Sequence, residues 1–368
     1  MTTILPPLHD YETSRRLLLA ECEQAGASLD GHRHPRPGPA GEPLHLDTAR
    51  FGAPPGEARS VVMVASGTHG VEGHGGWGLQ RLLLASGWLD RLPPGAAVVL
   101  VHAVNPFGMA WSRRVDHDNI DVNRNFVDFD GPLPANPLYP EVDLLVNPEH
   151  LDLDDASWQS ELLAFMGRVG GPAALRTLSG GQYDHPHGVQ FGGQAESWSR
   201  RALSEVWRKH LSGAATVIYL DIHTGLGPCG GLTLFQTADV DDEAAQAGAE
   251  WFPAVLRADR PGTSDPLQVG LVGPGLEEAA AGVPLVVPVT VEFGTQEIVP
   301  VFAAVRADNW LHQHGDPGSP QGQAIRVAMR EAFFVDDDGW RRGVAEQGLA
   351  TIRAALDALP TEQARHPG

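Results

Sequence analysis

Lysine, cysteine and long apolar runs are all scarce in this 368-residue chain. Lys209 is the only lysine, so every other basic side chain with a permanent charge is an arginine. The two cysteines, Cys22 and Cys229, are too few for a disulfide framework and lack the spacing of a thiolate zinc site. No stretch approaches the roughly 18 apolar residues that a membrane span requires, and the first residues do not resemble a signal peptide. We therefore expect a cytoplasmic protein without disulfides.

Basic residues are also few compared with acidic ones. The chain has 26 Lys and Arg against 46 Asp and Glu, which gives a formal net charge of −20 at pH 7. A field of this sign repels phosphate backbones and anionic membrane surfaces. Neither a nucleic acid nor a membrane is therefore expected as a partner, and the sequence leaves the oligomeric state open.

Short apolar runs alternate with amphipathic stretches along the chain. The runs that are typical of buried strands are Ser60–Ser66, Ala97–Val104, Thr216–Asp221, Leu232–Gln236 and Leu285–Glu292. Helical spacing of apolar residues is found at about Thr13–Ala25, Trp77–Leu89, Trp158–Val169, Glu196–Leu211, Asp241–Leu256 and Asp338–Leu359. This alternation predicts an α/β fold with a central mixed, mostly parallel sheet flanked by helices on both faces. Because no break in composition marks a boundary, residues 1–368 are expected to form a single domain.

Two segments do not fit the alternation and are predicted to be loop insertions, at about residues 127–157 and 179–193. The first is acidic and contains five prolines that would interrupt a helix. The second is rich in glycine, and it also contains Gln182, Tyr183, His185 and His187, which a plain linker would not need. Surface loops of this kind often carry function.

Reactive side chains follow the predicted strands, where ligands bind in open α/β sheets. His69 and Glu72 lie three residues apart at a glycine-rich turn, so an imidazole and a carboxylate can converge on one point. His9 and Glu12 have the same spacing, so the pattern alone proves little. His223, in Asp-Ile-His-Thr-Gly, is a third candidate ligand, although a strand-end histidine can also simply bond to backbone. Two histidines and one glutamate would leave the fourth position of a zinc ion open, as in a catalytic site.

Glu292 ends the apolar run Leu-Val-Val-Pro-Val-Thr-Val. A carboxylate at the end of a buried strand costs free energy unless it is paired or bound to something. Near a metal-activated water it could take a proton and later deliver it to a leaving amine. Pairing with an arginine is the structural alternative.

The most specific feature is the segment Asn105–Phe126, which contains Asn-Pro-Phe-Gly, a pair of arginines and Asp-Val-Asn-Arg-Asn. Together with His69-x-x-Glu72, the lone His223 and Thr-Val-Glu292-Phe, it resembles the ordered pattern of the zinc carboxypeptidase (funnelin) superfamily. Within that superfamily the chain resembles a bacterial branch catalogued as a domain of unknown function, near the divide between acylases and carboxypeptidases. The fold expected from this resemblance is zinc carboxypeptidase-like.

The resemblance implies a role for each residue of the predicted metal site. His69, Glu72 and His223 would bind zinc, and Glu292 would act as the general base. Asp121 would be the carboxylate that orients one of the ligand imidazoles.

The same resemblance implies how the substrate is held. Arg114, nine residues before Asn123, would stabilise the oxyanion, a register that Arg113 does not fit. Asn123 and Arg124 would hold the substrate's terminal carboxylate, since a planar guanidinium suits that group. The implied activity is a zinc-dependent hydrolase, a metallopeptidase or amidohydrolase that cleaves an amide bond adjacent to a free carboxylate. The substrate would be a small peptide or an N-acyl amino acid, and the motifs do not separate a carboxypeptidase from a deacylase.

One departure concerns tyrosine. Many peptidases of the superfamily place a tyrosine between the third zinc ligand and the base, but this chain has none after Tyr219. We expect the loop at 179–193 to fold over the open metal position, with Tyr183 or a neighbouring histidine supplying the missing hydrogen bond. The structural alternative is that Tyr183 only anchors a surface loop.

Other classes of protein fit less well. The run Gly73-His-Gly-Gly-Trp-Gly78 matches a dinucleotide-binding fingerprint but begins seven residues after the strand, too late for a tight turn onto a pyrophosphate. No Gly-x-Ser-x-Gly elbow of a serine hydrolase is present. The alternative outside enzymes is a non-catalytic zinc-containing protein that binds carboxylate ligands, in which Glu292 would be dispensable.

Overall fold

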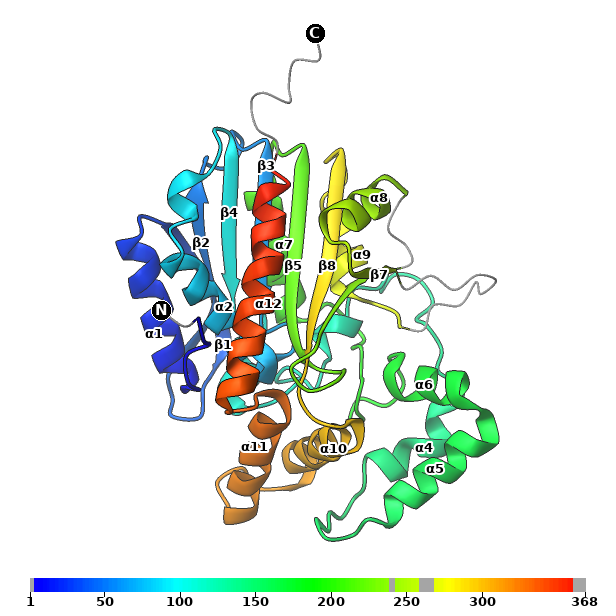
Figure 1. Ribbon diagram of the computed structural model, residues 1–368. Helices are drawn as coiled ribbons and strands as arrows, with labels where there is room; N and C mark the ends of the chain where they lie inside the picture. Colours follow the sequence, from blue (N-terminus) through cyan, green and yellow to red (C-terminus); the bar gives the residue numbers. More distant parts are fainter. Residues whose placement is uncertain (1–2, 238–241, 258–267, 360–368) are drawn as a thin grey trace.

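The computed structural model describes residues 3–237, 242–257 and 268–359. An eight-stranded sheet runs through the molecule in the order β1-β2-β4-β3-β5-β8-β6-β7 (Figure 1). Its four central strands are parallel, and they are β4 (Ala96–His102), β3 (Ser60–Ser66), β5 (Thr216–Gly225) and β8 (Leu285–Gly294). The predicted α/β fold with a mixed, mostly parallel sheet is confirmed.

The other four strands extend the sheet on both sides of these central strands. Strands β1 (Ser28–Pro37) and β2 (Pro43–Gly52) form an antiparallel pair beside β4, and β1 is almost fully exposed. An exposed edge strand needs no apolar alternation, which explains why the sequence gives no signal for it. On the other edge, β6 (Leu232–Gln236) pairs antiparallel with β8, and β7 (Val255–Arg257) pairs parallel with β6.

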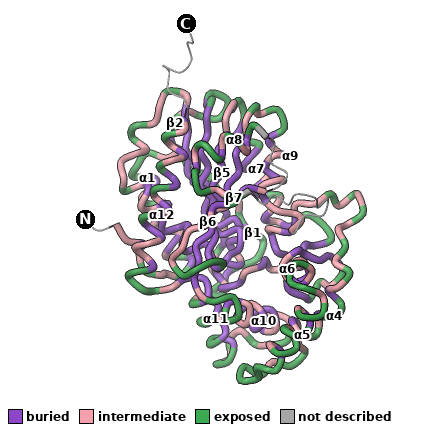
Figure 2. The backbone as a smooth tube through the Cα atoms, turned by 45° about the vertical axis from the view of Figure 1, so that its right-hand side comes forward, coloured by how far each residue is buried: buried purple, intermediate pink, exposed green. Residues whose placement is uncertain are grey.

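Helices cover both faces of the sheet. One face carries α1 (Tyr11–Gln24), α2 (Gly73–Ala85), α8 (Asp242–Trp251) and α12 (Asp338–Asp357), and the other carries α7 (Trp198–His210) and α9 (Val272–Ala279). Along β3, Val62 and Val64 join the apolar cluster on the first face while Val61 and Met63 join the cluster on the second. Figure 2 shows the strands as the buried interior between exposed helices and loops. The central strands are apolar throughout because both of their faces are covered.

The remaining helices are short turns or lie at the carboxyl ends of the central strands. They are η1 (Gly70–Glu72), η2 (Leu89–Arg91), α3 (Pro106–Trp111), η3 (Val122–Arg124), α4 (Tyr139–Val146), α5 (Ser157–Val169), α6 (Gly171–Ser179), α10 (Ile298–His314) and α11 (Pro320–Phe333). Figure 1 shows α10, α11 and the group α4–α6 together at one end of the sheet. The hydroxyl of Thr224, on β5, donates to the Phe333 carbonyl of α11 at 2.7 Å, which fixes α11 at that end. Within the described residues, no helix is long and apolar enough to cross a membrane.

Two predicted segments differ from the structure. The segment 127–157 is not a continuous loop, because α4 forms within it and Pro140 occupies the first helical turn, where no backbone N–H is required. Helices α4, α5 and α6 share an apolar cluster with α10, so this segment folds as a helical lobe. The helix predicted at Asp241–Leu256 has its first residue outside the described residues, and it ends at Trp251, two residues before Pro253. A proline disfavours helix at the residue before it, so the chain leaves the helix there and enters β7.

Helix α2 approaches strand β3 so closely that one of its positions must be glycine. A Cβ at Gly76 would come 2.5 Å from the Ser66 Cβ and 3.2 Å from the Ser66 Cα. Backbone and Cβ atoms cannot yield at that distance, so any side chain here would push the helix away from the sheet.

We expect Gly76→Ala to destabilise the protein by about 1–3 kcal/mol, the usual cost of overpacking. Gly167, in α5, has nothing within 4 Å of its ideal Cβ, so Gly167→Ala is the matched control. Alanine is the better helix former, and the control should be more stable than the wild type by about 0.5–1 kcal/mol. Urea denaturation of the three proteins checks both signs, and a stabilising Gly76→Ala would contradict the close approach.

Candidate metal centre

Three buried side chains converge at the carboxyl ends of β3 and β5. His69 is the N-cap of the short helix η1 that follows β3, and Glu72 is the last residue of this helix. His223 lies near the end of β5, the parallel neighbour of β3. One ligand atom from each residue lies within 4.8 Å of the others. The structure therefore brings together the three residues that the sequence predicts as metal ligands.

The distances between the three side chains suit a small tetrahedral ion. The Nδ1 atom of His69 is 2.9 Å from Glu72 Oε1 and 3.2 Å from His223 Nδ1, and His223 Nδ1 is 3.1 Å from Glu72 Oε2. Two nitrogen or oxygen ligands of a tetrahedral zinc, each bonded at roughly 2.0–2.1 Å, lie about 3.3 Å from each other. The spacing of these atoms fits zinc with little adjustment.

Asp121 lies behind the His69 ring, on the side away from the other two ligands. Its Oδ1 atom is 3.1 Å from His69 Nε2, so the ring presents Nδ1 to the centre. Burial alone would raise the pKa of Asp121, but the charges of Arg114 and His69 outweigh it and hold the pKa well below its usual range. An ionised, fully buried carboxylate is thus available to orient the imidazole.

Arg114 lies beside this carboxylate and beside the same histidine. Its guanidinium pairs with Asp121, its Nη2 atom is 2.7 Å from His69 Nε2, and its side chain keeps 12% exposure. Gln190 Oε1 accepts a further, long hydrogen bond of 3.4 Å from Arg114. Arg113 points elsewhere and is buried against Asp308 at 3.4 Å. The two neighbouring arginines therefore have different environments, and Arg114 is the one next to the ligands.

Glu292 enters the site from β8, directly across from His223 in the β5–β8 register. One carboxylate oxygen accepts a hydrogen bond from the Leu226 amide at 2.9 Å. Burial, followed by the nearby charge of Glu72, raises the pKa of Glu292 to about 8. No arginine or lysine among the described residues pairs with this carboxylate, so the arginine-paired alternative does not apply to it.

The side chains of Asn123 and Arg124 form hydrogen bonds with the protein backbone. The Asn123 side-chain oxygen accepts from the Val272 amide at 2.9 Å, at the start of α9. The buried Arg124 guanidinium donates to the Ser179 carbonyl at 2.8 and 3.1 Å and to the Asn123 carbonyl at 2.6 Å. Both residues thus connect η3 to neighbouring segments, and their role in binding a substrate carboxylate stays a prediction.

Tyr183 is likewise engaged with the backbone. Its hydroxyl donates to the Arg124 carbonyl at 2.6 Å, and the side chain is 2% exposed. The loop around it contains an isolated bridge between Gln182 and Phe191. These contacts match the anchoring role, and the capping role of Tyr183 stays a prediction.

The sequence analysis missed two residues of the site, Asp221 and Thr68. Asp221 Oδ2 is 3.0 Å from His223 Nε2, and the Thr68 hydroxyl donates to Asp221 Oδ1 at 2.8 Å. A signal existed, because residues two apart on a strand point to the same face and Asp221 precedes His223 by two.

The charge of the buried cluster also fits a metal ion. With the imidazoles neutral, four ionised buried carboxylates and the two guanidinium groups beside them leave two negative charges: Glu72, Asp121, Asp221 and Glu292 against the buried Arg124 and the partly buried Arg114. Uncompensated buried charge is costly, and a divalent cation would neutralise it. Burial opposes a charged His223 imidazolium, but Asp221 and Glu72 outweigh it and raise the pKa of His223 well above its usual range. The cluster therefore attracts positive charge.

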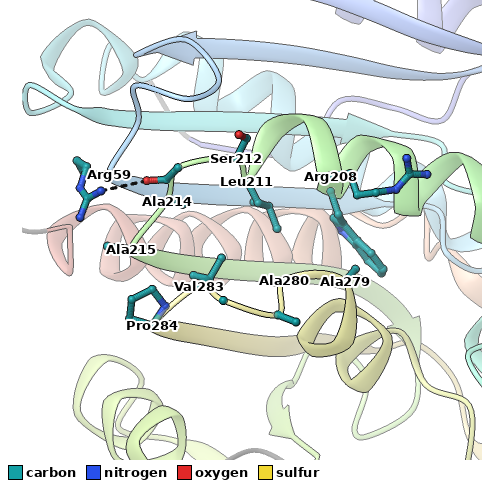
Figure 3. Close-up of a pocket in the computed structure, with 14 residues that line it drawn as sticks. Arg59, Arg208, Leu211, Ser212, Ala214, Ala215, Ala279, Ala280, Val283 and Pro284 are labelled. Atoms are coloured by element: carbon teal, nitrogen blue, oxygen red, sulfur yellow. Dashed lines mark hydrogen bonds between the residues drawn. The ribbon is translucent and has the colours of Figure 1, made fainter.

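A surface hollow of about 490 Å³ lies at the opposite end of the sheet (Figure 3). It is lined by residues that precede β3, β5 and β8, such as Arg59, Ala215 and Pro284. Arg59 donates there to the Gly213 carbonyl at 3.4 Å. The hollow contains none of the metal-site residues and has no part in the chemistry described here.

In this α/β chain, two histidines and a glutamate converge beyond the carboxyl ends of parallel strands. A family model described as "Protein of unknown function (DUF2817)" matches residues 8–347, and the chain belongs to this family. The match confirms a family of unknown function, as the motifs indicate. No curated protein matches the chain in sequence.

Several solved structures resemble the chain distantly. A carboxypeptidase A from Helicoverpa armigera is 14% identical, with 96% of this chain and 74% of that chain covered and a TM-score of 0.49. An aspartoacylase family protein from Mesorhizobium loti is 18% identical, with 78% and 66% covered and a TM-score of 0.40. A product-bound ectoine utilization protein from Ruegeria pomeroyi is 13% identical, with 86% and 72% covered and a TM-score of 0.38. At TM-scores below 0.5, no conclusion about the activity of this chain follows from them.

The turn between Arg114 and Asp121 contains a carboxyl group whose protonation should affect stability. Asp116 is buried, its Oδ1 accepts from the Asp118 and Ile120 amides at 2.9 and 2.8 Å, and its Oδ2 has no partner. Burial raises the pKa of Asp116 to about 7. The folded protein then holds a proton that the unfolded chain releases near pH 4. The free energy of unfolding therefore falls as the pH rises from about 4 to 7.

Asp116→Asn cannot ionise. We expect its free energy of unfolding, relative to that of the wild type, to be higher at pH 8 than at pH 5 by at least about 1 kcal/mol. Urea denaturation at the two pH values measures the difference. Asp118→Asn, an exposed carboxylate in the same turn, serves as the control and should show no comparable change. A stability difference for Asp116→Asn that is the same at both pH values would show that the buried carboxyl does not titrate in this range.

Proposed function

We propose that this protein is a zinc-dependent hydrolase that cleaves an amide bond adjacent to a free carboxylate. The observation that carries the proposal is the convergence of His69 Nδ1, His223 Nδ1 and the Glu72 carboxylate at mutual distances of 2.9–3.2 Å. Zinc held there would act as a Lewis acid and lower the pKa of a water molecule, which makes it a nucleophile at neutral pH.

Glu292 is the proposed general base. It lies across from His223 on the neighbouring strand, and the Leu226 amide holds one of its oxygens. The carboxylate takes the proton of the attacking water and delivers it to the leaving nitrogen. Its raised pKa reflects a burial that favours the protonated form, which suits the second of these steps.

Arg114 is the proposed donor to the oxyanion. Its guanidinium is the partly exposed cation beside His69, and its pairing with Asp121 fixes its orientation. Loss of one such donor commonly lowers the rate by about 10²–10³.

The proposed substrate is small and carries a free carboxylate. The three ligands are between 2% and 5% exposed, which favours a small peptide or an N-acyl amino acid over a folded protein. Arg124 uses three hydrogen bonds on backbone carbonyls, and a guanidinium has five N–H groups, so two remain for a carboxylate. Asn123 offers its amide nitrogen, because only its oxygen is used by Val272.

One experiment addresses the activity as a whole. Metal content is measured on the purified protein, which is then incubated with a panel of small C-terminal peptides and N-acyl amino acids. Cleavage of one set identifies the enzyme as a carboxypeptidase or as a deacylase. Binding of carboxylate ligands by the zinc-loaded protein without any cleavage would favour the non-catalytic alternative, a zinc-containing carboxylate-binding protein.

Mutations should distinguish the metal ligands from the general base. We expect Glu72→Ala and His223→Ala to lose zinc, because each removes one of three converging ligand atoms. Glu292→Gln should keep zinc and lose turnover by about 10²-fold or more, because the amide cannot accept the proton. Metal analysis and steady-state kinetics measure the two effects. Stoichiometric zinc in Glu72→Ala, or near-normal turnover in Glu292→Gln, would refute the corresponding assignment.

The carboxylate requirement can be tested on the substrate. Amidating the terminal carboxylate should raise KM or abolish cleavage, because a buried guanidinium would then face an uncharged group. Arg124→Ala should lose this discrimination, whereas Arg113→Ala, which removes a buried arginine paired with Asp308, should retain it. Circular dichroism checks that both variants fold. Equal cleavage of free and amidated substrates by the wild type would leave Arg124 with a structural role only.

A further inference from the structure

The two imidazoles of the candidate metal centre are each backed by a buried carboxylate, and only one of these carboxylates belongs to the motifs. Behind His69 lies Asp121, which the motifs predict. Behind His223 lies Asp221, whose Oδ2 is 3.0 Å from the ring Nε2. Resting on the proposed zinc hydrolase, we infer that Asp221, held by Thr68, is the positioning residue of His223 and sets how tightly the site binds its metal.

The contacts of His223 define what the carboxylate does. The ring's Nδ1 faces Glu72 Oε2 at 3.1 Å and His69 Nδ1 at 3.2 Å, while its Nε2 faces Asp221. The carboxylate lies 3.0 Å from Nε2 without the alignment of a hydrogen bond, and its negative charge favours a proton on that atom. Nδ1, the atom that points at the centre, would then supply the lone pair to a bound metal.

Thr68 fixes the carboxylate in turn. Its hydroxyl donates to Asp221 Oδ1 at 2.8 Å, and both side chains are buried. Thr68 directly precedes His69 in the chain, on the segment that leaves β3. The segment that carries one ligand therefore holds the carboxylate behind the other ligand, and this links the ends of β3 and β5 independently of any metal.

The two carboxylates differ in their other partners. Asp121 shares its charge with Arg114. Asp221 has no arginine or lysine partner in the part of the chain that the structure describes, and its hydroxyl partner is neutral. No guanidinium or ammonium group therefore offsets its negative charge beside His223. We expect Asp221 to raise the basicity of His223 more than Asp121 raises the basicity of His69.

The test is the zinc dissociation constant, measured by competition with a chromophoric chelator. Asp221→Asn is nearly isosteric but neutral, and its amide can also donate to Nε2, which would move the ring proton to Nδ1. We expect the affinity to fall by about 10- to 100-fold. Thr68→Val should cause a smaller loss in the same direction, and Thr68→Ser, which keeps the hydroxyl, should restore wild-type affinity.

A second readout and a control separate positioning from general damage. Cobalt substitution gives a visible spectrum that depends on ligand geometry, and we expect it to change in Asp221→Asn. Asp308→Asn removes a buried carboxylate that pairs with Arg113 and contacts no ligand, so it should lower the Tm without changing zinc affinity or the cobalt spectrum. The Tm of each metal-free variant reports the purely structural loss.

The outcomes are distinct. Zinc affinity of Asp221→Asn within twofold of the wild type, with an unchanged cobalt spectrum, would overturn the inference while leaving the zinc hydrolase intact. An equal loss of affinity in Asp308→Asn would also overturn it, because the effect would then be general. A wild-type protein that binds no zinc would overturn the proposed function and this inference together.

Discussion

Buried negative charge at the carboxyl ends of β3, β5 and β8 is the constraint on which the rest of the structure depends. Glu72, Asp121, Asp221 and Glu292 are all less than 9% exposed, and within the described residues only Asp121 is paired directly with a guanidinium. Such a group is tolerated when every carboxylate has a defined partner and a cation can balance the remainder. The backbone amides of Thr224 and Leu226, the Thr68 hydroxyl and the two imidazoles supply these partners. The same arrangement that makes the cluster costly without a cation makes it selective for one.

The segments around this cluster are held in conformations that the chain would not adopt alone. Four non-glycine residues in the described part of the chain have positive φ: Ala103, Ser112, Asn119 and Gln190. Each such residue costs roughly 1–3 kcal/mol, and such strain tends to collect at functional sites. Ala103 directly follows β4 and leads toward Asn105, Ser112 precedes the two arginines, and Gln190 contacts Arg114. The strain is balanced by local bonds, such as the Asn119 amide donating to the Pro186 and Gly188 carbonyls at 3.1 and 3.0 Å.

The centre of this protein could be predicted from its sequence, and its periphery could not. Strands Ser60–Ser66 and Leu232–Gln236 were predicted at their observed bounds because burial on both faces or clear turn residues mark them. Helix α10 was missed because its apolar residues point in three directions: Val301 and Ala304 pack in one cluster, Phe302 and Val305 in another, and Ala307 and Leu311 in a third. A helix surrounded on all sides shows no single stripe. For the site, spacing indicated which residues converge, but the hydrogen bonds that Asn123, Arg124 and Tyr183 form with the backbone depend on three-dimensional packing.

The adjacent residues Arg113 and Arg114 show how this periphery serves the centre. Arg113 is buried, with its side chain on Asp308 of α10, the Asn119 amide oxygen and the Asp116 carbonyl. These contacts fix the backbone from which Arg114 extends in the other direction toward Asp121 and His69. Helix α10, which no sequence pattern revealed, therefore supports the backbone that precedes Arg114. The salt bridge between Arg113 and Asp308 contacts none of the candidate ligands, so it contributes to the stability of the fold around the site and not to the electrostatics of the ligands.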